Sequence, residues 1–140
     1  MRVQFQGFNL PSTLKKLTLH KFGLPWRAVS ELGKLPCLEV LKLREQAFPG
    51  QRWEVDDEQF LNLKFLELSS SEIEEWNVSA ESFTCLQQLV VGDFSRLKEI
   101  PSIFGQISTL TIIRLHGCSN QVEFCLANPQ RSTGYGKRGT

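Results

Sequence analysis

The stretch LKKLTL at residues 14–19 is the first of five hexapeptides that share one pattern. An apolar residue is followed by two variable residues, a second apolar residue, one variable residue and a third apolar residue. The other four are LEVLKL at 38–43, LKFLEL at 63–68, LQQLVV at 86–91 and LTIIRL at 110–115. Their starts are separated by 24, 25, 23 and 24 residues. One such hexapeptide carries little information, whereas five at a nearly constant spacing predict a repeat fold.

The last two apolar residues of each hexapeptide lie two positions apart, so on a short strand both side chains point to the same side. A single strand cannot bury that side alone, but copies stacked about 4.8 Å apart in a parallel ladder can. A period of roughly 20–29 residues with this pattern is typical of leucine-rich repeats. We therefore predict an α/β solenoid, a horseshoe segment with a parallel concave sheet of about five short strands and an irregular or short-helical convex side.

A second set of apolar residues lies between the hexapeptides and is expected to pack the convex side onto the strands. Trp26, Trp53 and Trp76 also follow their hexapeptides at similar intervals. We expect these rings to pack inside the convex side, and exposed aromatic anchors for a partner are the alternative. The second set consists of Leu24, Val29, Leu32, Leu35, Phe48, Phe60, Ile73, Phe83, Leu97, Ile103, Phe104 and Ile107.

The repeats define the expected domain organisation. We assign residues 1–127 to a leucine-rich-repeat domain whose repeats start near 14, 38, 63, 86 and 110, with residues 1–13 as a partial unit. Residues 128–140, NPQRSTGYGKRGT, have almost no apolar side chains and predict a disordered tail. Neither end shows the polar capping unit that solenoids need for solubility, so we expect the chain to belong to a longer array.

Composition and charge exclude several classes of partner. The formal net charge of +1 gives no global electrostatic reason to expect nucleic acid. No segment approaches the roughly 18 apolar residues that span a bilayer, and the N-terminus lacks the apolar core of a secretory signal. We therefore predict no nucleic-acid partner, no membrane span and a cytoplasmic location.

The four cysteines form no C-x-x-C pair, which favours free thiols over a zinc site. They are Cys37, Cys85, Cys118 and Cys125.

The sequence contains no recognisable set of catalytic groups. His20 and His116 lie about four repeats apart with no visible serine, cysteine or carboxylate partner, so we expect both to be solvated. The acidic run WEVDDE at 53–58 lacks the spacing of a calcium loop and predicts a solvated convex face or a helix N-terminus. The tail segment GYGKRGT lacks the spacing of a phosphate loop. We predict a protein that is not an enzyme and takes no cofactor and no metal.

The positions that flank the inward-facing strand residues define a candidate protein-binding face. On stacked strands they form three columns. The first is Lys16, Val40, Phe65, Gln88 and Ile112; the second is Thr18, Lys42, Glu67, Val90 and Arg114; the third is His20, Arg44, Ser69, Gly92 and His116.

Several members of this face are apolar although the face is expected to contact water. They are Val40, Phe65, Val90 and Ile112, and the basic residues beside them are Lys42, Arg44 and Arg114. An apolar patch with a basic rim is typical of an interaction surface. Either a partner protein binds the patch, or an adjoining part of a longer protein covers it.

Several motifs between residues 10 and 118 are more specific than the repeat pattern. They are LKKLTL, LPW, S-x-L-G-K-L-P before LEVLKL, AF-x-G-x-x-W, D-E-x-F-x-x-LKFL-x-L and L-x-EIPS-x-FG-x-I-x-TL. As a set they closely resemble the C-terminal repeats of plant disease-resistance proteins of the coiled-coil, nucleotide-binding, leucine-rich-repeat class, in particular the late-blight-resistance type. The final stretch CSNQVEFCLANPQRSTGYGKRGT departs from that class, in which a helix rich in alanine and serine typically follows the last strand.

The resemblance implies a function in recognition. In that class the repeats hold a nucleotide-binding switch inactive and detect a pathogen effector, directly or through a guarded host protein, by shifting a two-state equilibrium. The implied partners are a pathogen effector, a host protein or the nucleotide-binding domain of a full-length receptor. The switch motifs themselves are not present in this sequence, so we do not assign ATP binding to it. The alternative is a free-standing leucine-rich-repeat adaptor or scaffold for signalling or substrate recognition.

Overall fold

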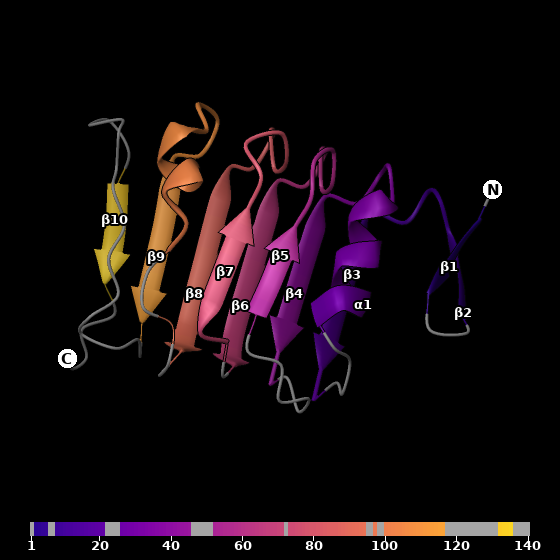
Figure 1. The fold of residues 1–140 in the computed structure, drawn as a ribbon, viewed down its shortest axis with the longest axis horizontal. Coiled ribbons are helices and arrows are strands. Elements are labelled where there is room, and N and C mark those ends of the chain that lie inside the picture. The colour runs from indigo at the N-terminus through magenta and orange to yellow at the C-terminus, as the bar shows by residue number, and fades with distance from the viewer. Residues whose placement is uncertain are drawn as a thin grey trace.

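The computed structural model describes residues 2–5, 8–21, 26–45, 52–71, 73–94, 97, 100–116 and 132–135. Apart from an N-terminal hairpin, these residues form two layers: a main sheet and a second layer on one of its faces, which lies nearer the viewer in Figure 1 and which we call the back layer. The main sheet consists of β3 (Lys16–His20), β4 (Val40–Arg44), β6 (Phe65–Ser71), β8 (Gln88–Phe94), β9 (Ile112–His116) and β10 (Ser132–Tyr135). The back layer consists of α1 (Trp26–Glu31), the 3-10 helices η1 (Leu32–Lys34) and η2 (Ser102–Gln106), β5 (Arg52–Val55) and β7 (Glu75–Val78).

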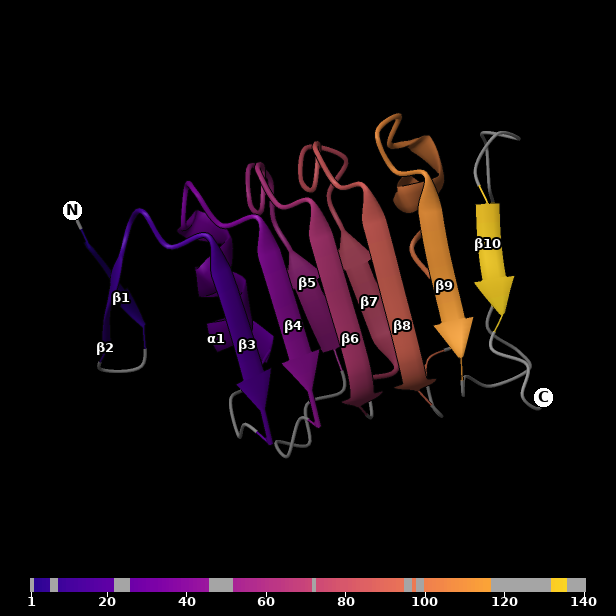
Figure 2. The ribbon, with the colours of Figure 1, turned by 180° about the vertical axis from the view of Figure 1, so that it is seen from behind.

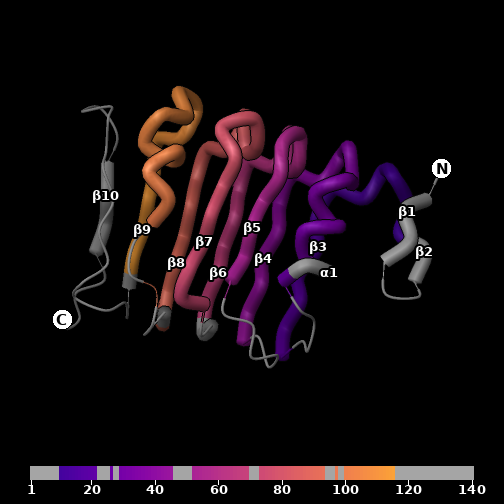
Figure 3. Tube along the Cα trace, in the orientation of Figure 1, coloured from indigo at the N-terminus to yellow at the C-terminus, as the bar shows by residue number. Residues whose placement is uncertain are grey.

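The main sheet is parallel throughout, with the order β10-β9-β8-β6-β4-β3. The register aligns the hexapeptides residue for residue, so that Leu41 lies between Leu17 and Leu66. Figure 3 shows how the described segments alternate between the main sheet and the back layer along the chain. The predicted parallel sheet of short strands is therefore confirmed.

The sheet has six strands rather than the five expected from the hexapeptides. The additional strand is β10, which pairs in parallel with β9 and lies within the predicted disordered tail. Within 128–140 the structure describes residues 132–135 alone, and the division into a repeat domain and a disordered tail stays a prediction. At the sheet edge, β9 offers a row of backbone groups that a glycine-containing segment can pair with, without a hydrophobic pattern of its own.

A repeated hydrogen-bond pattern fixes where each of the four later hexapeptide strands begins. In β4, the backbone amides of Glu39 and Val40 both donate to the carbonyl of Lys15, at 2.8 and 3.0 Å. The equivalent pairs in the next three units donate to Glu39, Lys64 and Gln87 at 2.8–3.3 Å. Each unit therefore satisfies its first strand amides through the preceding unit, which explains why the register repeats so regularly.

The chain leaves several strands through a residue with left-handed backbone. Lys21 and Glu45 have φ values of 56° and 54°, and each directly follows the last residue of its strand. Asp93, with a φ of 56°, lies inside β8 just before its last residue, Phe94. The amides of Lys21 and Glu45 still donate to the neighbouring strand, to Arg44 and Ser69. The sheet hydrogen bonding thus continues to the point where the chain turns away, at the cost of a conformation that side chains other than glycine adopt uncommonly.

The back layer differs in part from the expected irregular or short-helical convex side. Short helices are present, but β5 and β7 also form a second, two-stranded parallel sheet in which Trp53 pairs with Trp76. Their residues alternate between exposed and buried or half-buried, as strands with one packed face do. The acidic run at 53–58 is solvated as predicted, because Glu54, Asp56, Asp57 and Glu58 are exposed. A helix N-terminus at this run, the other alternative, is wrong.

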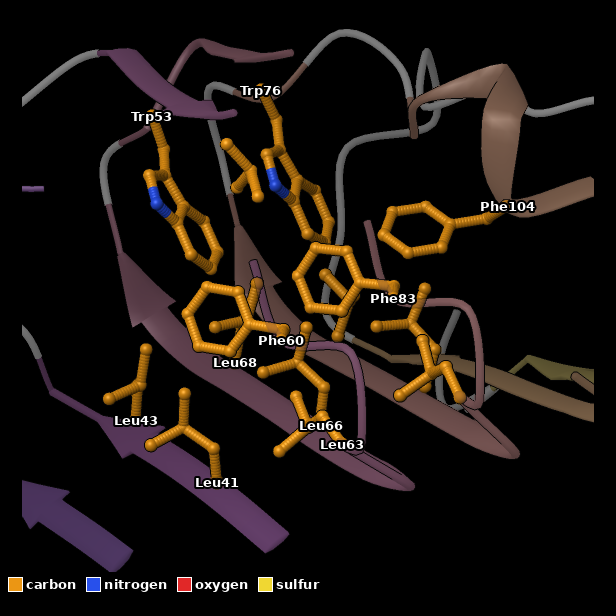
Figure 4. Close-up of a cluster of buried hydrophobic side chains, with 14 of the residues drawn as sticks. Leu41, Leu43, Trp53, Phe60, Leu63, Leu66, Leu68, Trp76, Phe83 and Phe104 are labelled. Atoms are coloured by element: carbon orange, nitrogen blue, oxygen red, sulfur yellow. The ribbon is translucent and has the colours of Figure 1, made fainter. Parts of the chain in front are cut away.

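The hydrophobic core lies between the two layers (Figure 4). Leucine, isoleucine and valine side chains from the main sheet meet a layer of aromatic rings from the back layer. The strand residues of this core are fully buried in the middle of the sheet and only partly buried in β3, which forms one sheet edge. The buried strand residues are Leu41, Leu43, Leu66, Leu68, Leu89, Val91, Ile113 and Leu115.

The three tryptophans pack inside the molecule, as expected. Trp53 stacks between Trp26 and Trp76, with ring centroids 4.6 and 5.5 Å away. A parallel row joins Phe60 to Phe83 at 5.0 Å, and Figure 4 shows these two rings between the tryptophans and the leucines below. The reading of the tryptophans as exposed anchors is therefore wrong. Of the second apolar set, Ile103 is half-buried, Leu24 and Phe48 lie outside the described residues, and the others are buried.

The N-terminal residues form a separate hairpin. Strands β1 (Arg2–Phe5) and β2 (Phe8–Pro11) pair antiparallel and are not part of the main sheet. The hairpin precedes the first hexapeptide, within the stretch predicted to be a partial unit. Antiparallel pairing is therefore confined, among the described residues, to the segment before the repeats.

Candidate protein-binding face

The face of the main sheet that points away from the back layer carries the predicted binding residues; we call it the open face. Figure 2 shows the sheet from this side, with no other labelled element in front of it. The strand register places Lys16, Val40, Phe65, Gln88 and Ile112 in one continuous row across the sheet. The second and third columns align in the same way. The predicted residues are therefore brought together in three columns, and their role in binding stays a prediction.

Exposure varies along the open face according to the neighbours that each strand has. The open-face side chains of the edge strand β3 (Lys16, Thr18 and His20) are exposed, and so is Arg114 on β9. Side chains in the middle are half-buried because flanking strands cover their sides; these are Val40, Lys42, Arg44, Phe65, Glu67, Ser69, Gln88, Val90 and Ile112. Gly92 is buried, and the side chain of His116 lies outside the described residues.

An apolar row crosses the open face along its first column. Val40 and Phe65 are register partners, and Ile112 follows after Gln88. Val90, in the second column, lies on the strand between Phe65 and Ile112 and extends the row. Neighbouring strands are about 4.8 Å apart, so the row from Val40 to Ile112 is roughly 14 Å long. Such a row is long enough to contact several side chains of a partner.

Arg44 differs from its predicted role as part of a free basic rim. Its Nε donates to Glu67 Oε2 at 3.0 Å and its Nη2 donates to Glu67 Oε1 at 3.3 Å. The hydrogen bond and the charge of Glu67 raise the pKa of Arg44. This two-point ion pair joins β4 to β6 across the open face and compensates the charge of Arg44. The sequence could not show it, because the pair is diagonal across two strands.

Lys42 is placed over an aromatic ring. Its Nζ lies 5.6 Å from the centre of the Phe65 ring, a separation at which the ring face attracts a cation. The Lys42 ammonium therefore lies over one face of the Phe65 ring, on the open side of the sheet. Phe65 itself is half-buried.

The remaining groups with potential chemistry are dispersed. His20 Nε2 lies 3.4 Å from Glu45 Oε1 on the exposed edge, a contact that the sequence pattern had not indicated. Cys37 and Cys85 are half-buried free thiols, in agreement with the prediction, while Cys118 and Cys125 lie outside the described residues. Within the described ranges, no three histidine, cysteine or acidic side chains gather as metal ligands would. Nor does any described helix have the length and apolarity to cross a membrane.

Comparison with known proteins relates this chain to plant resistance proteins. It is 38% identical over 121 residues to the late blight resistance protein homolog R1B-12 of Solanum demissum, an alignment that covers 85% of this chain and 9% of that protein. For the homolog R1B-13 of the same species the identity is 39% over 104 residues, covering 73% of this chain and 9% of that protein. For R1B-23 it is 36% over 121 residues, covering 85% of this chain and 10% of that protein.

No protein-family model matches the chain. The relatives nevertheless agree in name and in the extent of the alignment, and the chain spans only 9% to 10% of their length. What those proteins do as a whole is therefore not a property of this segment alone. By sequence, the chain belongs to the late-blight-resistance family of plant resistance proteins.

Proposed function

We propose that residues 1–127 form a leucine-rich-repeat solenoid segment, and that this segment serves as a protein-recognition region of a cytoplasmic plant immune receptor. The open face is the proposed binding surface. The observation that carries the proposal is the in-register apolar row of Val40, Phe65 and Ile112 on that face, in a chain related to resistance proteins.

Packing considerations support a binding role for this row. The apolar side chains of this row face away from the core, which the inward-facing residues of the same strands form. Apolar residues on a solvent-facing sheet surface are typical of interaction sites. A partner that covers the row removes this apolar surface from water, which favours association. The covering surface is an effector, a host protein or another domain of the receptor, and the same residues serve in each case.

A receptor-level experiment tests this function. The matching segment of the homolog R1B-12 is replaced by this chain, and cell death in leaves is compared with and without pathogen challenge. We expect the double variant Phe65→Ala and Ile112→Ala either to abolish the response or to cause cell death without challenge. Leu61→Ser is the matched control, because Leu61 is 40% exposed but lies outside the open face. Unaltered basal and triggered responses in the open-face variant would refute the proposal.

A further inference from the structure

Three cations of the open face form no ion pair within the described part of the structure. No described carboxylate lies within 4.0 Å of the charged nitrogens of Lys16, Lys42 or Arg114. Arg44 is the exception, because Glu67 accepts two hydrogen bonds from it. The face therefore presents three available cations in its first two columns.

The back layer has the opposite sign. Lys34 and Arg52 are the basic side chains described there, and both are paired: Lys34 with Glu31 at 2.9 Å, and Arg52 with Glu75 at 2.8 Å. Acidic side chains outnumber them and are exposed or half-buried; they are Glu31, Glu54, Asp56, Asp57, Glu58, Glu74, Glu75 and Glu81. The two faces of the molecule thus differ in charge although the net charge of the chain is only +1.

The available cations and the apolar row are interleaved. Lys42 and Arg114 belong to the same column, on β4 and β9, three strand intervals and therefore roughly 14 Å apart. Val90 lies in that column next to Arg114, and Phe65 lies under the Lys42 ammonium. A ligand that crosses the strands along these columns meets positive charge at both ends. Between the two cations lie Val90 and Glu67 in the same column, with Glu67 already paired to Arg44, and Phe65 and Ile112 in the neighbouring column.

We propose that the open face binds a protein segment that combines acidic and apolar side chains. Two carboxylates of this segment pair with Lys42 and Arg114, and its apolar side chains cover Phe65, Val90 and Ile112. A carboxylate that draws the Lys42 ammonium away from the ring also uncovers Phe65 for the partner. This inference rests on the proposed function and names the chemistry of the partner. The acidic back layer repels the same segment, so that charge selects the face as well as the ligand.

The arrangement favours a protein over a nucleic acid as the acidic ligand. Single-stranded nucleic acids are typically bound by a continuous basic groove with several aromatic platforms for the bases. Here Glu67 lies in the middle of the charged column, and Phe65 is the single aromatic residue among the described open-face side chains. Aliphatic side chains between separated cations match an amphipathic peptide better.

Defined peptides test the proposal with the purified chain. The first peptide alternates glutamate with leucine and serine, the second has lysine in place of glutamate, and the third has serine in place of leucine. A 20-nucleotide single-stranded DNA is the fourth probe. Binding is measured by fluorescence anisotropy at low salt and at 0.5 M salt. We expect the first peptide to bind best and to weaken at high salt, because the screening length shortens there.

Charge-reversal variants locate the binding. Lys42→Glu with Arg114→Glu is expected to weaken binding of the acidic, apolar peptide about tenfold and to favour the lysine peptide instead. Lys34→Glu with Arg52→Glu changes the net charge equally on the back layer and is expected to leave the affinity within about twofold. Circular dichroism of both variants verifies that the fold is retained.

Three results would overturn the inference: equal binding of the acidic and lysine peptides, preferential binding of the DNA, or an equal loss in the front and back variants. None of these results would alter the receptor experiment above. If the Phe65 and Ile112 variant still changes the response of the receptor, the open face binds a partner whose chemistry is not acidic, and the two proposals are thereby separated.

Discussion

The two faces of the main sheet are built from alternate residues of the same strands, yet they follow different rules. On the packed face, each strand contributes the same kind of residue, so that Leu66 lies between Leu41 and Leu89 in the register. On the open face, Phe65 lies between Val40 and Gln88. The packed face is uniform because stacking requires neighbours of matching shape. The open face has no such requirement, so its residues can be specific to a ligand.

Among the buried residues, we expect the largest loss of stability when the enclosed ring of Trp53 is removed. Trp53 is fully buried and stacks on two other indoles, so Trp53→Ala removes a large side chain from between both neighbours. We expect a loss of about 3–5 kcal/mol in the free energy of unfolding, measured by urea titration. Glu54→Ala is the control, since Glu54 is the exposed neighbour on the same strand, and it should change stability by less than about 0.5 kcal/mol. Similar losses in both variants would contradict the packing described for β5.

A smaller loss of stability is expected at Gly33, where the neighbouring residues of the back layer leave no room for an added methyl group. A Cβ at Gly33 would lie 2.7 Å from the Cβ of Gln59 and 2.9 Å from the Phe60 ring. Gly33→Ala should therefore destabilise the fold by about 1–3 kcal/mol, as overpacking does. Lys34→Ala, at the exposed next residue, is expected to be nearly neutral when thermal melts of the two variants are compared. An unchanged melting temperature for Gly33→Ala would show that Gly33 lies farther from Gln59 and Phe60 than described.

The smallest effect concerns one hydrogen bond between successive units of the back layer. Trp53 Nε1 donates to Ser30 Oγ at 2.8 Å. Ser30→Ala removes this acceptor and should cost about 1 kcal/mol. The same substitution in a Trp53→Phe background should cost less, because phenylalanine has no N–H and only the bond from Ser30 Oγ to the Glu54 carbonyl, 3.1 Å long, is then lost. Equal costs in both backgrounds would mean that the bond contributes nothing.

The inward and outward strand positions could be predicted from the sequence because strand alternation and a constant period specify them together. Leu41 and Leu66, for example, are equivalent in both respects. The alternation in Arg52-Trp53-Glu54-Val55 was also present in the sequence, but the charges of the run at 53–58 favoured a solvated convex face or a helix N-terminus. The buried Trp53 and Val55 make it a strand with one packed face. Short strands with acidic outer residues are therefore easily missed.

Other features depend on contacts that no sequence pattern specifies. The Arg44–Glu67 ion pair and the position of Lys42 over Phe65 follow from side-chain geometry across neighbouring strands. The pairing of β10 follows from the open edge of β9 rather than from the composition of its own segment. The candidate site was thus predictable as a set of positions, whereas the charges available to a partner were not.

The most direct measurement compares the unfolding of Leu66→Ala and Phe65→Ala in urea. Leu66 has 0% of its surface exposed, and its truncation should cost about 2–5 kcal/mol. Phe65 points to the open face, so its truncation should cost less than about 1 kcal/mol while weakening partner binding. A greater loss of stability for Phe65→Ala than for Leu66→Ala would show that the two faces are assigned the wrong way round.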